Sequence, residues 1–157
     1  MGPFPKSEQK KYLLVGTDYF TKWVETEPLV HIRDQDVESF LWKNIVTRFG
    51  IPRALVMDNG TQFKSSNIKE FCDKYGIKQS FSFPSYPQGN GQAEASNKVI
   101  LDGLKKRLDE SKGKWVSELP SMLWAYRTTP RRSTRETSFS LTHGTEPSSL
   151  WRSDSLR

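Results

Sequence analysis

The sequence predicts a single domain of the mixed α/β class, a sheet flanked by helices. Three observations support this prediction. Short apolar runs of strand length alternate with longer segments of helical periodicity, in the order strand, strand, helix, strand, helix, strand. Glycine and proline separate these segments. The chain has 157 residues, of which 34% are hydrophobic, so it can bury one compact core but hardly two.

The first half of the chain contains all the expected strands. The two earliest apolar runs are joined by a short link, which favours an antiparallel hairpin. Asp34 is a candidate cap for the first helix, and Gly50 and Pro52 end it. A second helix follows a Ser66 cap and ends at Gly76. The expected strands are 12–17, 23–29, 54–57 and 77–83, and the expected helices are 34–49 and 66–75.

The second half is expected to be helical. A loop rich in proline and glycine, residues 84–92, precedes a helix over 92–108 whose buried stripe contains Leu104 and Leu108. The same wheel places Ala93 and Ile100 on that stripe, and Glu94, Lys98 and Lys105 on a polar ridge beside it. A further amphipathic helix spans 115–127, which Pro120 is expected to kink or divide.

Composition limits the partners and compartments. The formal net charge of +6 favours polyanionic partners, although basic domains are common and this indication is weak alone. One cysteine and two histidines exclude a disulfide framework and a Cys/His zinc site within these residues. No apolar run approaches the ~20 residues that span a bilayer, and no secretory signal is present. We therefore expect a soluble, intracellular protein with no membrane partner.

Two acidic residues stand out by their positions. Asp58 follows a buried strand and precedes an Asn-Gly turn, and Glu94 lies in the first turn of a helix. Ligands bind at the carboxyl ends of strands in open α/β sheets, and carboxylates suit Mg²⁺ there. The plainer interpretation is that Asp58 is an Asx-turn residue and Glu94 an acid favoured by the helix dipole. Local spacing alone favours the plainer interpretation.

The surrounding motifs change that balance. The segment FGIPRALVMDNGTQFKSSNIKEFCDKYGIKQSFSFPSYPQGNGQAEASNK resembles the core of retroviral-type integrases, specifically those of plant gypsy-type LTR retrotransposons. That family places 35 residues between an Asp-Asn-Gly and a helix-opening Glu, and here 35 residues separate Asp58 from Glu94. The resemblance continues through DYFTKWVETEPL and KWVSELPSMLWAYRTTPRRST, so it covers roughly residues 2–144. It implies a ribonuclease H-like mixed sheet flanked by helices.

The resemblance also implies roles for individual residues. Asp58 and Glu94 match the second and third carboxylates of the family's Asp-Asp-Glu triad, which binds Mg²⁺ or Mn²⁺. Asn97 and Lys98 match its Glu-x-x-Asn-Lys helix, in which the lysine approaches DNA, and Lys105 lies on the same ridge. For Lys98 an alternative remains open, a solvated ion pair with Glu94 four residues earlier.

The first aspartate of the triad has no match. In the family it precedes a Gly-Pro-Phe/Leu-Pro segment, and here that segment begins at Gly2, directly after Met1. Asp18 is a doubtful substitute because it matches the family's second strand. In ribonuclease H-like sheets the opening strand separates that strand from the one bearing Asp58, so two spacings of about 4.8 Å would intervene. Paired metals lie only ~3.5–4 Å apart. We expect weak metal binding and an opening strand that is missing or incomplete.

These inferences define the expected organisation and function. Residues 1–10 are a lead-in remnant, 11–144 the integrase catalytic-core-like domain, and 145–157 a poorly ordered tail. The expected function is DNA integration by a polynucleotidyl transferase of this transposable-element lineage, inactive here for want of the first aspartate. The alternative is a non-catalytic nucleic-acid-binding or assembly domain, or a degenerate retroelement fragment. The expected partners are DNA and a second copy of the chain, with no small-molecule substrate, and the resemblance implies the nucleus.

Overall fold

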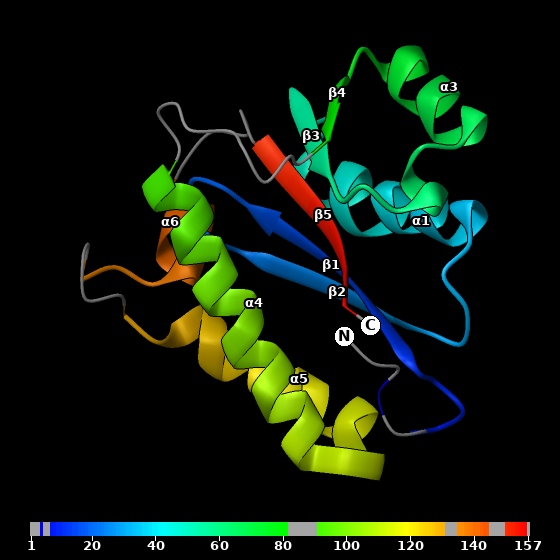
Figure 1. Ribbon diagram of the computed structural model, residues 1–157. Helices are drawn as coiled ribbons and strands as arrows, with labels where there is room; N and C mark the ends of the chain where they lie inside the picture. The colour runs from blue at the N-terminus through cyan, green and yellow to red at the C-terminus, as the bar shows by residue number, and fades with distance from the viewer. Residues whose placement is uncertain (1–3, 5–6, 82–90, 131–134, 145–149, 157) are drawn as a thin grey trace.

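The computed structural model describes residues 4, 7–81, 91–130, 135–144 and 150–156, and within these the side chains of 91–100, 143–144, 150, 152 and 154–156 are not described. Its centre is a five-stranded sheet in the order β2-β1-β5-β3-β4. Helices cover both faces of the sheet, with α1 and α3 on one side and α4 and α5 on the other (Figure 1). The predicted mixed α/β class with flanking helices is confirmed.

The predicted hairpin at the start of the chain is present. β1 (Tyr12–Asp18) pairs antiparallel with β2 (Val24–Leu29), so that Tyr12 lies opposite Leu29 and Thr17 opposite Val24. Asp18 and Lys22 close the turn, since the Lys22 N–H donates to the Asp18 carbonyl oxygen at 2.8 Å. β1 is buried along nearly its whole length, because another strand pairs with it on the side away from β2.

The first helical segment covers the predicted span but is not uniform. It consists of α1 (Asp34–Phe40), a π-helical segment η1 (Leu41–Val46) and α2 (Thr47–Phe49). Its cap position is Arg33, one residue before the predicted one, and the Asp36 carboxylate accepts the Arg33 N–H at 3.1 Å. The segment ends at Gly50, whose φ of +91° is the left-handed backbone that favours glycine.

The next three elements form a parallel β-α-β unit. β3 (Ala54–Met57) and β4 (Lys78–Phe81) pair in parallel, and α3 (Ser66–Tyr75) connects them. The α3 cap is Ser65, whose hydroxyl oxygen accepts the Ile68 N–H at 3.3 Å, so the predicted cap was one residue late. Gly76 ends the helix in the left-handed conformation, as predicted from its position.

Between residues 91 and 144 the described part of the chain consists mainly of helices. α4 spans Gly91–Ser111, a 3-10 turn η3 spans Lys112–Lys114, α5 spans Trp115–Thr128 and α6 spans Ser138–Gly144. Pro120 lies inside α5 without dividing it. Since Pro120 is the sixth residue of α5, its missing N–H costs only one bond early in the helix. Residues 84–90 of the predicted loop 84–92 lie outside the described residues.

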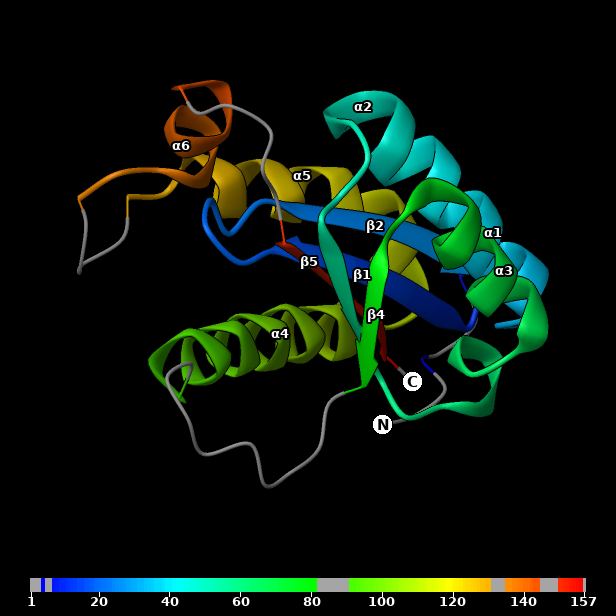
Figure 2. The ribbon, with the colours of Figure 1, turned by 90° about the horizontal axis from the view of Figure 1, so that it is seen from above.

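The tail is the main difference from the sequence-based expectation. Residues 145–157 were expected to be poorly ordered, but Leu150–Leu156 forms β5 in the middle of the sheet. β5 runs antiparallel to β1 and parallel to β3, and Figure 2 shows it lying between them. Hydrogen bonds to the edges of β1 and β3 and the burial of Trp151 stabilise the segment. The sequence of the segment predicts neither the strand pairing nor the burial. The opening strand, expected to be missing or incomplete, would have lain between β1 and β3. In the structure the C-terminal segment occupies that position.

Each face of the sheet has its own hydrophobic core. The core under α1 and α3 includes Leu14, Phe40, Leu55, Met57 and Trp151. Gly16 makes this packing possible, since a β-carbon there would lie 3.3 Å from both Phe40 and Ile45. The core under α4 and α5 contains Phe4, Leu13, Val15, Val24, Leu104, Leu108, Trp115, Leu119 and Leu123. The two predicted stripe residues Leu104 and Leu108 are among its members.

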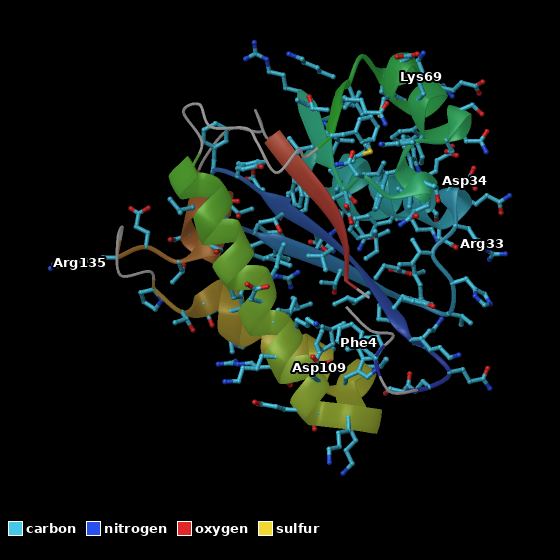
Figure 3. The ribbon with its side chains drawn as sticks, viewed as in Figure 1. Phe4, Arg33, Asp34, Lys69, Asp109 and Arg135 are labelled. Carbon is cyan, nitrogen blue, oxygen red and sulfur yellow. The ribbon has the colours of Figure 1, made fainter. Side chains whose placement is uncertain are left out.

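The lead-in segment is anchored to the second core. Phe4, labelled in Figure 3, is buried. Its ring centroid lies 5.2 Å from that of Trp115. Ser7 is also buried, and its hydroxyl oxygen accepts the Val116 N–H at 3.2 Å. Glu8 lies in an exposed turn closed by the Ser7–Lys10 bridge. The described part of the lead-in thus packs against α5.

Candidate metal and nucleic-acid site

Asp58 lies where the chain leaves the sheet after β3. Its N–H donates to the Ser153 carbonyl oxygen of β5 at 3.3 Å, so β3–β5 pairing continues one residue past the strand. Gly60 then leads into η2 (Thr61–Phe63), and the end of the Gln62 side chain packs directly over it, 2.7 Å from where a β-carbon would lie. The fully buried Phe63 fixes the end of that turn. The backbone of Asp58 is therefore held from both sides.

Asp58 is half-buried, and its carboxylate is not used by the part of the fold that the structure describes. Among the described residues it has no hydrogen-bond or ion-pair partner. The plain Asx-turn interpretation would give it a backbone N–H within the turn. A half-buried carboxylate without such a partner is available to a ligand.

The helix that carries the other predicted residues is present. Glu94 lies in the first turn of α4, and Asn97 and Lys98 follow one turn later. Their side chains fall outside the described part of the structure, and Figures 1 and 2 place the start of α4 well to the left of β3, so the described backbone does not bring the first turn of α4 to the end of β3. Leu104 and Leu108 pack α4 into the core that contains Val15, on the face of the sheet away from α1 and α3.

Lys105 is half-exposed on α4, beside the buried stripe. A shallow surface depression at the C-terminal end of α4 is lined by acidic and basic side chains together, namely Asp102, Lys105, Lys106, Asp109, Glu110 and Lys112. Figure 3 shows Asp109 near this end of the helix. The lysines of the predicted polar ridge are thus accompanied by carboxylates at the described, C-terminal end of α4.

Asp18 is engaged in the hairpin turn. Its side chain is buried and accepts the Thr21 hydroxyl at 2.6 Å and the backbone N–H groups of Phe20 and Thr21 at 3.4 Å. β5 separates β1 from β3, so Asp18 lies two strands away from Asp58. This carboxylate stabilises a turn, whereas that of Asp58 has no described partner.

No group of three or more histidine, cysteine, aspartate or glutamate side chains that could hold a metal exists within the described residues. That part of the chain also contains no helix with the length and apolar character needed to cross a membrane. Residue 154 of β5, which follows Ser153 in the β3–β5 pairing beside Asp58, was not among the residues predicted for this site. An apolar pair, Leu150–Trp151, next to a polar segment is too short a pattern to predict a central strand.

The sheet order and the helices on both faces define a ribonuclease H-like domain of the kind found in integrase catalytic cores. Residues 1–87 match the family model described as the integrase core domain, and the chain belongs to that family. The Gag-Pol polyprotein of avian reticuloendotheliosis virus is 35% identical over 122 residues, which are 78% of this chain and 11% of the polyprotein. That of feline leukemia virus is 37% identical over 121 residues, 76% of this chain and 7% of the polyprotein. The chain spans about a tenth of these curated relatives.

Solved structures show the same fold. The HTLV-2 integrase catalytic core domain in complex with magnesium, in a trimeric form, has a TM-score of 0.65 at 24% identity and covers 91% of this chain and 93% of that one. An intasome of simian T-cell lymphotropic virus, in complex with PP2A regulatory subunit B56 gamma, has a TM-score of 0.66 at 20% identity and covers 91% and 52%. At these identities the likeness establishes the architecture alone.

Proposed function

We propose that this chain is the catalytic core of an integrase that joins element DNA to target DNA by phosphodiester transfer. The observation that carries the proposal is the placement of Asp58 and Glu94, the first directly after β3 and the second in the first turn of α4. The 35 residues between them match the spacing in integrases of plant gypsy-type LTR retrotransposons, and we assign the chain to that lineage. Such a domain acts on DNA inside the cell, in the nucleus.

Asp58 and Glu94 are proposed to hold Mg²⁺ or Mn²⁺. The donor set fits, because carboxylate oxygens are the hard ligands these ions prefer, and the half-buried Asp58 carboxylate has no described partner that would compete. When bound, paired divalent ions supply activation of the attacking oxygen and stabilisation of the leaving oxygen. The protein holds the Asp58 backbone through β5 and the η2 turn, so the point from which the carboxylate extends is fixed before any ligand arrives.

With Asp58 and Glu94 as the only carboxylates, the site would bind metal weakly and the chain would be inactive in strand transfer. Loss of an anchoring carboxylate removes part of the charge stabilisation on which phosphodiester transfer depends. That prediction rests on the absence of the first aspartate, which the family carries on the opening strand between the strands that correspond to β1 and β3. In the structure β5 fills that place.

DNA binding is proposed to use Asn97, Lys98 and Lys105 on α4. The net charge of +6 supports attraction to phosphates, and neutralising phosphates releases counterions. A non-catalytic DNA-binding or assembly role would need only these residues and not the carboxylates. Self-association is also expected, since Trp124 is 62% exposed and Phe139 41% exposed on the α5–α6 surface.

A paired experiment tests the proposal. Titration of the labelled chain with Mg²⁺, followed by NMR, should shift the amides of residues 58 and 94, and Asp58→Asn or Glu94→Gln should abolish the shifts. Duplex DNA binding across a salt series should weaken with salt, and Lys98→Glu with Lys105→Glu should weaken it further. Metal shifts that survive both carboxylate variants contradict the metal site. Binding indifferent to salt and to both lysines contradicts the DNA-binding surface.

A further inference from the structure

Residue 154 lies next to Asp58 in the sheet. β3 and β5 pair in parallel with Leu55 opposite Trp151 and Met57 opposite Ser153, and the hydrogen bond from the Asp58 N–H to the Ser153 carbonyl oxygen extends this pairing. The next pair in the register is therefore residue 58 and residue 154. Neighbouring strands lie about 4.8 Å apart, so the two positions are separated by one strand spacing. The sequence places an aspartate at both.

Positions 58 and 154 also belong to the face covered by α4. Leu55 and Trp151 lie opposite each other and pack in the core under α1 and α3. Residues alternate between the faces of a strand, so positions 152 and 154 belong to the other face. The pairing with β1 agrees, because residue 154 is opposite Val15, a member of the core under α4 and α5. Glu94 lies in the first turn of the helix that covers this face.

Two adjacent carboxylate positions on one face of a sheet repel each other unless a cation neutralises them. Asp18 shows how this fold satisfies a carboxylate that it uses structurally, with one hydroxyl and two backbone N–H donors. The Asp58 carboxylate has no such donors among the described residues. A divalent cation shared with a neighbouring aspartate would satisfy it.

On this basis, and resting on the proposed metal site at Asp58 and Glu94, we infer that Asp154 is its third carboxylate, supplied by the C-terminal strand β5. The strand thereby has two roles. It completes the sheet between β1 and β3, and it brings an acidic residue to the end of β3. The three acidic positions then come from β5, the end of β3 and the first turn of α4, a helix that packs through Leu104 and Leu108 on the face shared by the other two.

A direct test uses the unmodified 157-residue chain. Substoichiometric Mn²⁺ broadens the NMR signals of amides close to the ion, so broadening at residues 58, 94 and 153–155 together is the expected result. Broadening at 58 and 94 without broadening at 153–155 overturns the inference and leaves the proposed function standing. Broadening that includes neither 58 nor 94 overturns both. This measurement needs no variant and does not depend on how a substitution affects folding.

Variants give the second test. Asp154→Asn should weaken Mg²⁺ and Mn²⁺ binding, measured by calorimetry, by at least about tenfold, as loss of a ligating or supporting group does. Asp58→Asn and Glu94→Gln should do the same, and Asp73→Asn, an exposed carboxylate on α3 on the opposite face, should change nothing. If Asp154→Asn binds metal as the unmodified chain does, while Asp58→Asn does not, Asp154 is not a ligand.

Thermal melting separates a metal role from a purely structural one. Without metal, Asp154→Asn should melt at or above the temperature of the unmodified chain, because the repulsion between positions 58 and 154 is relieved. With saturating Mg²⁺ the unmodified chain should gain stability and the variant should not, because only binding to the folded state raises the melting temperature. A variant that melts lower without metal and still gains fully from Mg²⁺ assigns Asp154 a structural role and overturns the inference.

Discussion

The two faces of the sheet are assembled in different ways. Apart from Trp151, the buried core under α1 and α3 comes from residues 14–77, a continuous stretch of chain. The buried core under α4 and α5 combines Phe4, strand residues 13–24 and helix residues 104–123. Figures 1 and 2 show these as separate layers on either side of the strands. The first layer depends on local contacts, whereas the second depends on segments distant in sequence.

This difference bears on the site. Position 154 and α4 belong to the second face, and Asp58 is held where β3 meets β5. One strand connects the two layers, since Trp151 of β5 lies in the first core while residue 154 pairs with Val15 of the second. The site thus depends on the distant contacts more than on the local ones, and removing β5 should affect both.

The largest expected effect follows from deleting residues 150–157. The deletion exposes the paired edges of β1 and β3 and removes Trp151, which is 1% exposed. Loss of a buried tryptophan alone costs about 3–5 kcal/mol, and total domain stability is only about 5–15 kcal/mol. We expect the truncated chain to lose cooperative unfolding in urea, followed by near-UV circular dichroism. Deletion of Arg157 alone is the control, and an unchanged urea midpoint after the longer deletion would contradict a central role for β5.

Matched core truncations compare the two layers directly. Trp115→Ala and Phe40→Ala each remove a buried aromatic ring, from the second and the first core respectively, and each should destabilise by about 3–5 kcal/mol. In amide hydrogen exchange, Trp115→Ala should speed exchange mainly in α4 and α5, whereas Phe40→Ala should speed it throughout. Equal acceleration in α3 by both variants would show that the layers unfold as one unit.

A smaller effect is expected where Arg127 of α5 reaches the edge strand β2. Glu25 is buried and accepts Trp23 Nε1–H at 2.8 Å, and its carboxylate lies 3.0 Å from Arg48 and 3.7 Å from Arg127. Arg127 also donates to the Val24 carbonyl and lies 4.2 Å from the centroid of the Trp23 ring.

Removing the acid leaves Arg127 without its partner charge. Burial already lowers the pKa of Arg127, with Glu25 opposing that shift. Glu25→Ala should therefore cost about 2–3 kcal/mol by urea denaturation. Arg48→Ala should cost less than about 1 kcal/mol, because the Arg48 side chain is 54% exposed. Equal costs for the two variants would contradict this assignment.

The smallest effect concerns Cys72 in the first core. Burial, and secondarily Asp73, raises the pKa of this thiol to about 11, so it is protonated and shielded at neutral pH. Iodoacetamide at pH 8 should modify it slowly in the folded chain and quickly in urea, and mass spectrometry reads one site because the chain has one cysteine.

The raised pKa of Cys72 also sets a direction for stability against pH. The folded state keeps the proton up to about 11, while the unfolded thiol releases it near 9.0, so its contribution is lost as pH rises between these values. Rapid alkylation of the folded chain would show that the first layer opens more readily than its packing indicates.

The sequence by itself determined the parts of this protein in which local pattern and packing agree. The hairpin, the helix from Asp34 to Phe49, β3 and α3 follow from apolar periodicity and from glycine positions, and Leu104 and Leu108 lie where a helical wheel places them. Asp58 and Glu94 were located by spacing in a resemblance, and the structure places their backbones at the end of β3 and the start of α4. These features depend mostly on neighbours in the chain.

The position of the last strand, β5, between β1 and β3 is determined by the tertiary structure and not by the local sequence. Residues 150–156 are polar apart from Leu150, Trp151 and Leu156, and their local pattern predicts no central strand. They form one because β1 and β3 present two unpaired edges, and every buried backbone N–H and C=O group there needs a partner. Pairing across more than ninety residues, from Met57 to Ser153, therefore fixes the neighbour of Asp58. No local pattern in the sequence encodes that neighbour, because it is set by the edges of strands that form elsewhere.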